Sequence, residues 1–100
     1  MNAIFVLILL YTLNLNPQKS GEKLFSMYCI ACHAGGNNVI IPEKNLKKET
    51  LENLGINNSA SLIYQIRNGK NGMPAFGGRL KQKEIEAISE FLLETKEFKE

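Results

Sequence analysis

The chain contains the sequence Cys29-Ile30-Ala31-Cys32-His33, in which a histidine directly follows two cysteines that are three positions apart. On a helical turn, cysteines with this spacing lie on one face and can form thioethers with the two vinyl groups of one porphyrin. The imidazole of the next residue is then held beneath the ring, where it can coordinate the iron. The motif therefore predicts a covalently attached c-type haem with His33 as one axial ligand.

Three other interpretations of the two cysteines fit the sequence less well. A thioredoxin-like redox pair also uses Cys-x-x-Cys, but it requires a βαβ context, and no segment of this chain alternates as a strand does. A closed structural zinc site needs four nitrogen or sulfur ligands, whereas the chain holds two cysteines and one histidine. A disulfide is geometrically awkward between residues three apart on a helix. Haem attachment accounts for both cysteines and for His33.

The second axial position of such a haem also needs a ligand, and the chain has no other histidine. Methionine is a common partner of histidine in cytochromes c. Met1 lies in the apolar N-terminal segment, and Met27 precedes Cys29 on the same helix and faces away from the ring. Met73 follows a glycine in a loop whose glycines allow the backbone to approach the haem. Met73 is therefore the predicted ligand, and core filling is the alternative role for this side chain.

Helices are expected to position these residues, because apolar side chains recur at helical spacing and no segment shows a period of two. Ser20 and either Asn58 or Ser59 are expected to act as N-caps, and Gly55 is expected to end a helix. On the first and last helices, Phe25 and Phe91 are expected to pack together. The predicted helices cover residues 21–32, 46–54, about 59–68 and about 82–98. The predicted fold class is all-α.

The N-terminal segment differs from the rest of the chain. Residues 1–18 contain no charged side chain, and an apolar run extends from Ala3 to Leu13. Its length is that of a signal-peptide core, although it has no basic residue near Met1 and no small-x-small cleavage site. We expect residues 1–16 to be a signal peptide, with a retained anchor as the alternative, and residues 17–100 to form a cytochrome c domain. A domain this small usually needs a covalent staple, which haem would provide.

The formal net charge is +2, and the lysines are interspersed with glutamates. This pattern is typical of an ordinary solvated surface. No basic tract with interleaved aromatic residues is present, so nucleic acid is not an expected partner.

Three long stretches of the chain resemble one known family. They are GEKLFSMYCIACHAGGNN at 21–38, LKKETLE at 46–52 and YQIRNGKNGMPAFGGRL at 64–80. In these stretches the chain is similar to the cytochrome c6 family of algae and cyanobacteria. The resemblance implies a class I cytochrome c fold, about four helices wrapped around one covalently bound haem c. It also implies a carrier of single electrons from the cytochrome b6f complex to photosystem I in the thylakoid lumen.

The resemblance also implies roles for particular residues. Cys29 and Cys32 match the attachment cysteines, and His33 and Met73 match the axial ligands. Gln65 matches a glutamine close to the haem that tunes its reduction potential.

Two more residues are expected to act in partner docking. Arg79 matches a family arginine near the exposed haem edge that is used in docking to photosystem I. Phe76 is expected to contribute to a flat apolar docking patch, and the alternative is that it packs against the haem. The other residues expected in this patch are Ile30, Ala31, Ala34 and Ala75.

Other functions share some of these residues. A cytochrome that donates electrons to a terminal oxidase would use the same haem residues. A peroxidase-like enzyme would need an open sixth position, which Met73 would fill, and a thiol oxidoreductase would leave His33 unexplained. We therefore expect an electron carrier that is not an enzyme, and we expect it to be a monomer that docks transiently.

Overall fold

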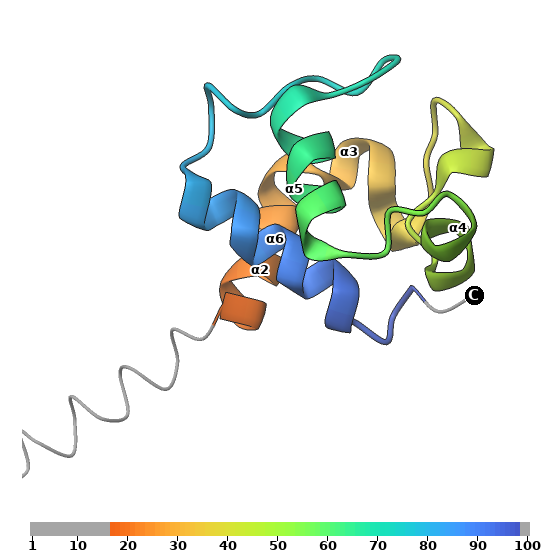
Figure 1. The fold of residues 1–100 in the computed structure, drawn as a ribbon, viewed down its shortest axis with the longest axis horizontal. Helices are drawn as coiled ribbons and strands as arrows, with labels where there is room; N and C mark the ends of the chain where they lie inside the picture. Colours follow the sequence, from red (N-terminus) through yellow and green to blue (C-terminus); the bar gives the residue numbers. More distant parts are fainter. Residues whose placement is uncertain (1–16, 99–100) are drawn as a thin grey trace, which may run out of the picture.

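The computed structural model describes residues 17–98, which form helices joined by loops (Figure 1). Within this range no strand is present, and Lys70 and Met73 form an isolated bridge. The all-α prediction is confirmed. The helices are α2 (Pro17–Tyr28), α3 (Ile30–His33), α4 (Lys48–Asn53), α5 (Ser59–Asn68) and α6 (Gln82–Glu94), with 3-10 turns at Ala34–Gly36 and Pro42–Lys44.

The predicted signal peptide, residues 1–16, lies outside the described residues. None of the helices at 17–98 is both long enough and apolar enough to span a membrane.

In residues 17–98, α2 and α6 cross and share the most extensive contact between any two helices (Figure 1). Gly21 lies at the crossing, where a Cβ atom would overlap the carbonyl oxygen of Ala87 and come within 2.8 Å of the Phe91 Cβ. Only glycine allows this approach of the two backbones. The predicted packing is confirmed, since the rings of Phe25 and Phe91 lie 5.6 Å apart.

The first helix differs from its predicted bounds at both ends. Among the described residues it covers Pro17–Tyr28, so Ser20 lies inside the helix and the prediction that it is the N-cap is wrong. At the other end the helix stops at Tyr28. Cys29, with φ −114° and ψ −19°, separates α2 from the single turn of α3. The attachment motif therefore starts at a break between two helices.

The other helices follow the predictions more closely. The side chain of Asn58 accepts a hydrogen bond from the Ser61 amide at 2.9 Å, so it is the N-cap of α5. Gly55, at φ +70°, follows α4 as expected. That helix starts at Lys48, later than predicted. The Lys47 amide donates a hydrogen bond to the Asn45 Oδ1 at 3.0 Å, which keeps Lys47 in an extended conformation.

The last helix ends earlier than predicted, at Glu94 rather than near residue 98. Thr95 adopts an extended conformation with ψ 140°. Residues 95–98 then turn back, and Phe98 packs against Phe25 and Phe91, with ring centroids 5.5 and 6.1 Å away. Burial of the Phe98 ring therefore stabilises the domain more than another turn of α6 would. Figure 1 shows this segment running from α6 towards α4.

Candidate haem site

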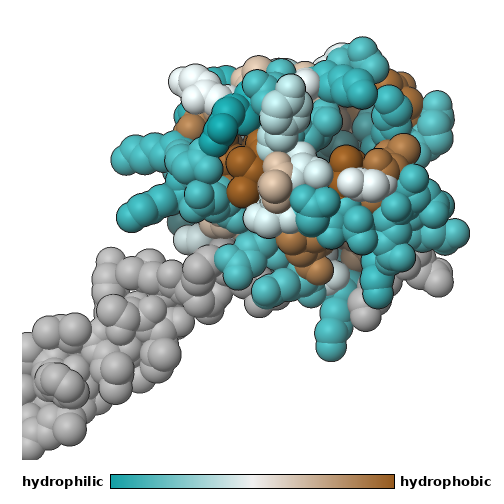
Figure 2. Space-filling model, viewed as in Figure 1, coloured by the Kyte–Doolittle hydropathy of each residue, from teal (hydrophilic) through white to brown (hydrophobic). Residues whose placement is uncertain are grey.

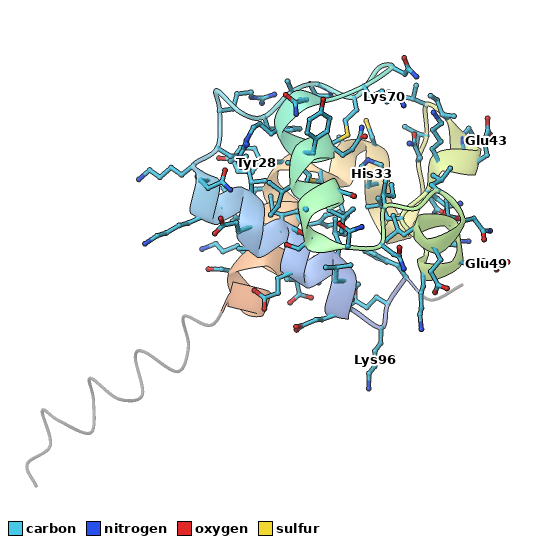
Figure 3. The ribbon with its side chains drawn as sticks, in the orientation of Figure 1. Tyr28, His33, Glu43, Glu49, Lys70 and Lys96 are labelled. Atoms are coloured by element: carbon cyan, nitrogen blue, oxygen red, sulfur yellow. The ribbon has the colours of Figure 1, made fainter. Side chains whose placement is uncertain are left out.

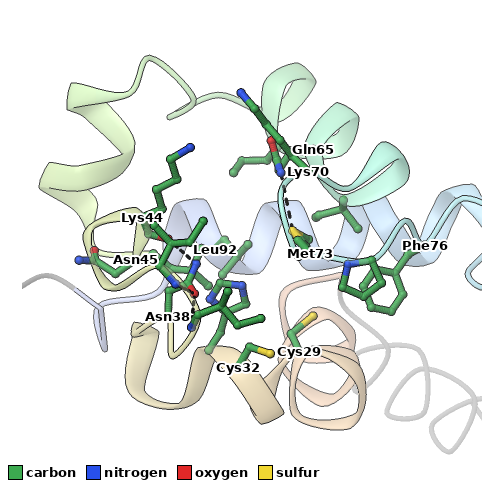
Figure 4. Close-up of a pocket in the computed structure, with 18 of the residues that line it drawn as sticks. Cys29, Cys32, Asn38, Lys44, Asn45, Gln65, Lys70, Met73, Phe76 and Leu92 are labelled. Carbon is green, nitrogen blue, oxygen red and sulfur yellow. Dashed lines mark hydrogen bonds between the residues drawn. The ribbon is translucent and has the colours of Figure 1, made fainter.

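A cavity of about 380 Å³ lies between α3, α5 and two loops, one at 37–47 and the other at 69–81. Figure 4 shows its interior, with the cysteines on one side and Met73 and Gln65 on the other. The cavity is lined by the five residues predicted to act in haem binding and by two of those predicted to act in docking. They are Cys29, Cys32, His33, Gln65, Met73, Phe76 and Arg79. Of the other residues predicted in the docking patch, Ala31 lines the cavity, whereas Ile30, Ala34 and Ala75 do not.

Apolar side chains form much of the remaining wall, and several of them belong to the hydrophobic core. Those from the core are Phe25, Leu51, Leu62, Ile66, Ile88 and Leu92. The cavity thus takes the place of part of the core of this small domain. A cavity of this size and composition is typical of a cofactor site.

The two cysteines are half-buried free thiols on the cavity wall. Backbone hydrogen bonds fix their geometry, because the Cys29 amide donates to Phe25 and the His33 amide donates to Cys29, both at 2.9 Å. Burial raises the pKa of the Cys29 thiol to about 11, and the neighbouring Cys32 adds to the rise. Cys29 is therefore a neutral thiol at neutral pH.

The imidazole of His33 has a defined orientation. Its Nδ1 lies 2.8 Å from the carbonyl oxygen of Asn37. A carbonyl can only accept, so Nδ1 is the nitrogen that carries the proton and donates it. The lone pair of a neutral imidazole is then on Nε2, which is the arrangement seen in metal-ligating histidines. Figure 3 shows His33 and Tyr28, which come from helices on opposite sides of the Cys29 break.

A tight turn presents Met73. The amide of Lys70 donates to the Met73 carbonyl at 3.1 Å, and the Met73 amide donates to the Lys70 carbonyl at 3.0 Å. Between them Asn71 and Gly72 have φ of +45° and +94°. Two successive residues with positive φ characterise a type I′ turn, for which Asn-Gly is the preferred sequence. The dipeptide predicts this turn, although the sequence analysis used only the freedom of the glycines.

Gly69 brings this turn back towards α5. It has φ +68°, and a Cβ atom there would overlap the Met73 carbonyl oxygen and lie 2.8 Å from the Ala75 nitrogen. The Met73 sulfur consequently faces α5, where the Gln65 Nε2 donates a long hydrogen bond to it at 3.7 Å (Figure 4). Gln65 and Met73 are thus in contact across the cavity wall.

At the mouth of the cavity, the Phe76 ring contacts two other side chains, Tyr28 and Arg79. The Tyr28 ring meets Phe76 edge-on with centroids 6.4 Å apart, and the guanidinium carbon of Arg79 lies 4.7 Å from the centre of the Phe76 ring. Phe76 is 5% exposed, whereas Arg79 is exposed. The contact of Tyr28 with Phe76 was not predicted from the sequence.

Asn38 is a further residue that the sequence analysis did not identify. Its Oδ1 accepts from the Ile40 and Ile41 amides at 3.0 and 2.9 Å, and its Nδ2 donates to the Lys44 carbonyl at 3.0 Å. These bonds fold the loop after His33 into one wall of the cavity (Figure 4). The cluster Gly35-Gly36-Asn37-Asn38 indicates a turn, but the partners of an asparagine depend on the path of the whole loop.

The donor set fits a c-type haem. One largely apolar cavity gathers two thiols that could form thioethers, an imidazole with a free Nε2 and a thioether sulfur. The sequence contains no other cysteine or histidine.

Comparison with known proteins gives the class of protein. A family model described as cytochrome c oxidase, cbb3-type, subunit III, matches residues 16–92. The solved structure of cytochrome c6 from the diatom Phaeodactylum tricornutum has a TM-score of 0.73 and 49% sequence identity. The match covers 76% of this chain and 90% of that chain. The protein is a class I c-type cytochrome with covalently bound haem c.

Individual relatives are more specific. Cytochrome c6 from Bumilleriopsis filiformis is 53% identical over 79 residues, which cover 79% of this chain and 92% of that protein. Cytochrome c6 from Petalonia fascia is 57% identical over 74 residues, which cover 74% of this chain and 87% of that protein. The chain belongs to the cytochrome c6 family, and it is a haem-based electron carrier.

Proposed function

We propose that this chain carries single electrons from the cytochrome b6f complex to photosystem I in the thylakoid lumen. In this proposal Cys29 and Cys32 hold the haem through thioethers, and His33 and Met73 are its axial ligands. The observation that carries the proposal is that one cavity brings together both cysteines, the histidine and a methionine of this chain.

The chain's own residues support these roles. The bond from His33 Nδ1 to the Asn37 carbonyl leaves Nε2 as the donor atom. The Gln65 amide orients the Met73 sulfur and places a polar group beside the proposed ligand, which suits a residue that tunes the potential. When bound, haem supplies reversible one-electron exchange at its iron. The buried apolar wall excludes water, which favours the less charged, reduced state.

The mouth of the cavity supports docking to an acidic partner. Lys44, Lys70 and Arg79 all line the cavity and are exposed. Such charges steer the encounter and raise the association rate more than the affinity. Figure 2 shows a mostly hydrophilic face with apolar side chains in small patches, which suits a transient contact. Since the Phe76 ring is buried, we propose that it packs beneath Arg79 and that Arg79 makes the docking contact.

Substitution of Met73 tests the ligand assignment. Met73→Ala should abolish the absorption band of methionine-ligated ferric haem and lower the reduction potential, because sulfur ligation raises it. The control is Met27→Ala, since Met27 is 59% exposed and lies outside the cavity lining. Equal spectra and potentials for the two variants would contradict the assignment.

Reaction kinetics test the proposed acceptor. After a laser flash, the native carrier should reduce photosystem I, and the second-order rate should change with ionic strength. Arg79→Ala should lower the rate constant by about tenfold at low salt. Lys96→Ala removes an exposed charge from the C-terminal segment (Figure 3) and should change it much less. Equal rates for both variants would remove Arg79 from the docking site.

A second candidate function is donation to a terminal oxidase. It is favoured by the description of the matching family model, which names an oxidase subunit. Measuring the turnover of a purified oxidase and of photosystem I with the same reduced carrier separates the two functions. Faster oxidase turnover would replace photosystem I as the proposed acceptor.

The proposed location depends on residues 1–16, which we propose are a signal peptide. The intact mass of the protein purified from its own cells tests this. A shortened chain plus one haem supports cleavage, and the full chain plus haem supports the anchor. A mass without haem would contradict the attachment.

A further inference from the structure

The orientation of the His33 imidazole depends on one backbone carbonyl. His33 Nδ1 donates to the Asn37 oxygen at 2.8 Å, and the Asn37 amide donates to Ala34 at 3.2 Å. The imidazole and its acceptor therefore belong to the same short turn. Any contact that fixes this turn also fixes the rotation of the ring.

Gly36 is the buried centre of that turn. Its φ is +80°, and a Cβ atom there would come within 2.7 Å of the Phe98 ring. On its other side, the Gly36 carbonyl accepts from the Leu46 amide at 2.7 Å. The backbone next to Asn37 is thus held between an aromatic ring and a hydrogen bond.

Phe98 is itself firmly placed. Its side chain is 6% exposed, and its ring packs against Phe25 and Phe91. Its carbonyl accepts from the Lys48 amide at 3.0 Å, which ties it to the start of α4. The early end of α6 makes these contacts possible, because the chain must leave the helix at Thr95 to reach Gly36.

We propose that Phe98 is a positioning residue for the haem-binding imidazole. Its ring presses on Gly36, which holds the Asn37 carbonyl in line with the His33 Nδ1–H. The inference rests on the proposed function, since it concerns the histidine proposed to bind the iron. A firmly held Nδ1–H bond fixes the ring plane and increases the basicity of Nε2.

The test measures the His33 Nδ1–H itself in the haem-loaded protein. Phe98→Leu keeps an apolar side chain but removes the ring from Gly36. The matched control is Phe91→Leu, which removes a ring from the same aromatic cluster but not the ring that faces Gly36. Phe98 is then still held by the Phe25 ring and by the hydrogen bond from the Lys48 amide. In the reduced, diamagnetic state, NMR gives the rate at which the Nδ1 proton exchanges with solvent, and thermal unfolding gives the stability of each variant.

Phe98→Leu should accelerate this exchange by about tenfold, the factor expected when one ordinary hydrogen bond is no longer restrained. Phe91→Leu, with a comparable loss in Tm, should exchange at nearly the native rate. Equal acceleration in both variants would show a general loss of stability and overturn the inference. Absorption spectra separate this failure from that of the proposed function. If the native protein has a histidine-ligated haem but the Nδ1 proton exchanges equally fast in the two variants, only the role of Phe98 is rejected. If the native protein has no histidine-ligated haem, the role of Phe98 and the proposed function are both rejected.

Discussion

The two sides of this domain are held together by different kinds of interaction. On the side of the α2–α6 crossing, the rings of Phe25 and Phe91 pack together, and Gly21 allows the backbones of the two helices to approach closely. On the cavity side, the loops are shaped by hydrogen bonds from asparagines and by residues with positive φ. The first side is held by contacts within the chain, whereas in our proposal the haem completes the second. Damage to the two sides should therefore have different consequences.

Loss of haem attachment should have the largest effect. In Cys29→Ala/Cys32→Ala the apolar cavity loses its occupant. Leaving 380 Å³ empty would cost up to about 9 kcal/mol, and water entering the mouth would reduce this cost. That is comparable to the entire stability of a small domain. We expect no cooperative thermal transition by circular dichroism, with residual helix from the α2–α6 side. A transition at the native temperature would show that the haem does not complete the fold.

Gly21→Ala breaks the opposite side. The added methyl group would overlap the Ala87 carbonyl, so the helices must separate at a cost of about 1–3 kcal/mol. Thermal unfolding should show a lower Tm, while the reduction potential stays close to native. The control is Gly78→Ala, because a Cβ atom at Gly78 has no neighbour within 4 Å. An equal change in Tm for both variants would contradict the proposed close packing.

Asn38→Ala damages the cavity side without touching the core. It removes three hydrogen bonds from the loop after His33 and should cost about 1–2 kcal/mol. Because water then gains access to the cavity, we expect the reduction potential to fall, in contrast to Gly21→Ala. Asn38→Asp retains the acceptor for both amides and should lower the Tm less than Asn38→Ala does. If Asn38→Ala lowers the Tm but leaves the reduction potential unchanged, the expected contrast with Gly21→Ala is contradicted.

Asn58→Ala should give the smallest effect. It removes the N-cap of α5, which accepts from Ser61, and should cost about 1 kcal/mol. Since α5 supplies Gln65 to the cavity and Leu62 to the core, both sides should weaken slightly. Hydrogen exchange should increase in the first turn of α5. Unchanged protection there would show that the cap is not needed.

The same contrast explains how much could be predicted from the sequence. Apolar spacing and the N-cap Asn58 predicted α5, and the pairing of Phe25 with Phe91 followed from helical periodicity. The helix and its cap depend on residues that are near in sequence, and the Phe25–Phe91 pair requires only that two apolar helix faces meet. The hydrogen bonds of Asn38 join residues within six positions, but they form only when the whole loop takes its path. The end of α6 depends on contacts of Phe98 with Phe25 and Gly36, which are distant in sequence. Thr95 fits the apolar face of the predicted helix, and only the burial of Phe98 makes the chain turn there.

The candidate site shows this division as well. The motif from Cys29 to His33 and the position of Met73 in a glycine-rich loop predicted residues that do meet at one cavity. Tyr28 was not predicted at the site, because periodicity does not distinguish a core residue from the wall of a cofactor cavity. Asn37 acts through its backbone carbonyl, so its side chain carries no signal of the contact with His33.

The pairing of α2 with α6 also sets an order of events during biogenesis. Its two helices come from opposite ends of the described domain, so the crossing forms only after α6 has been synthesised. Cys29 and Cys32 emerge long before that. Both thiols are therefore accessible for as long as the crossing has not formed, and closure of the domain by its last helix is the step that limits access to them.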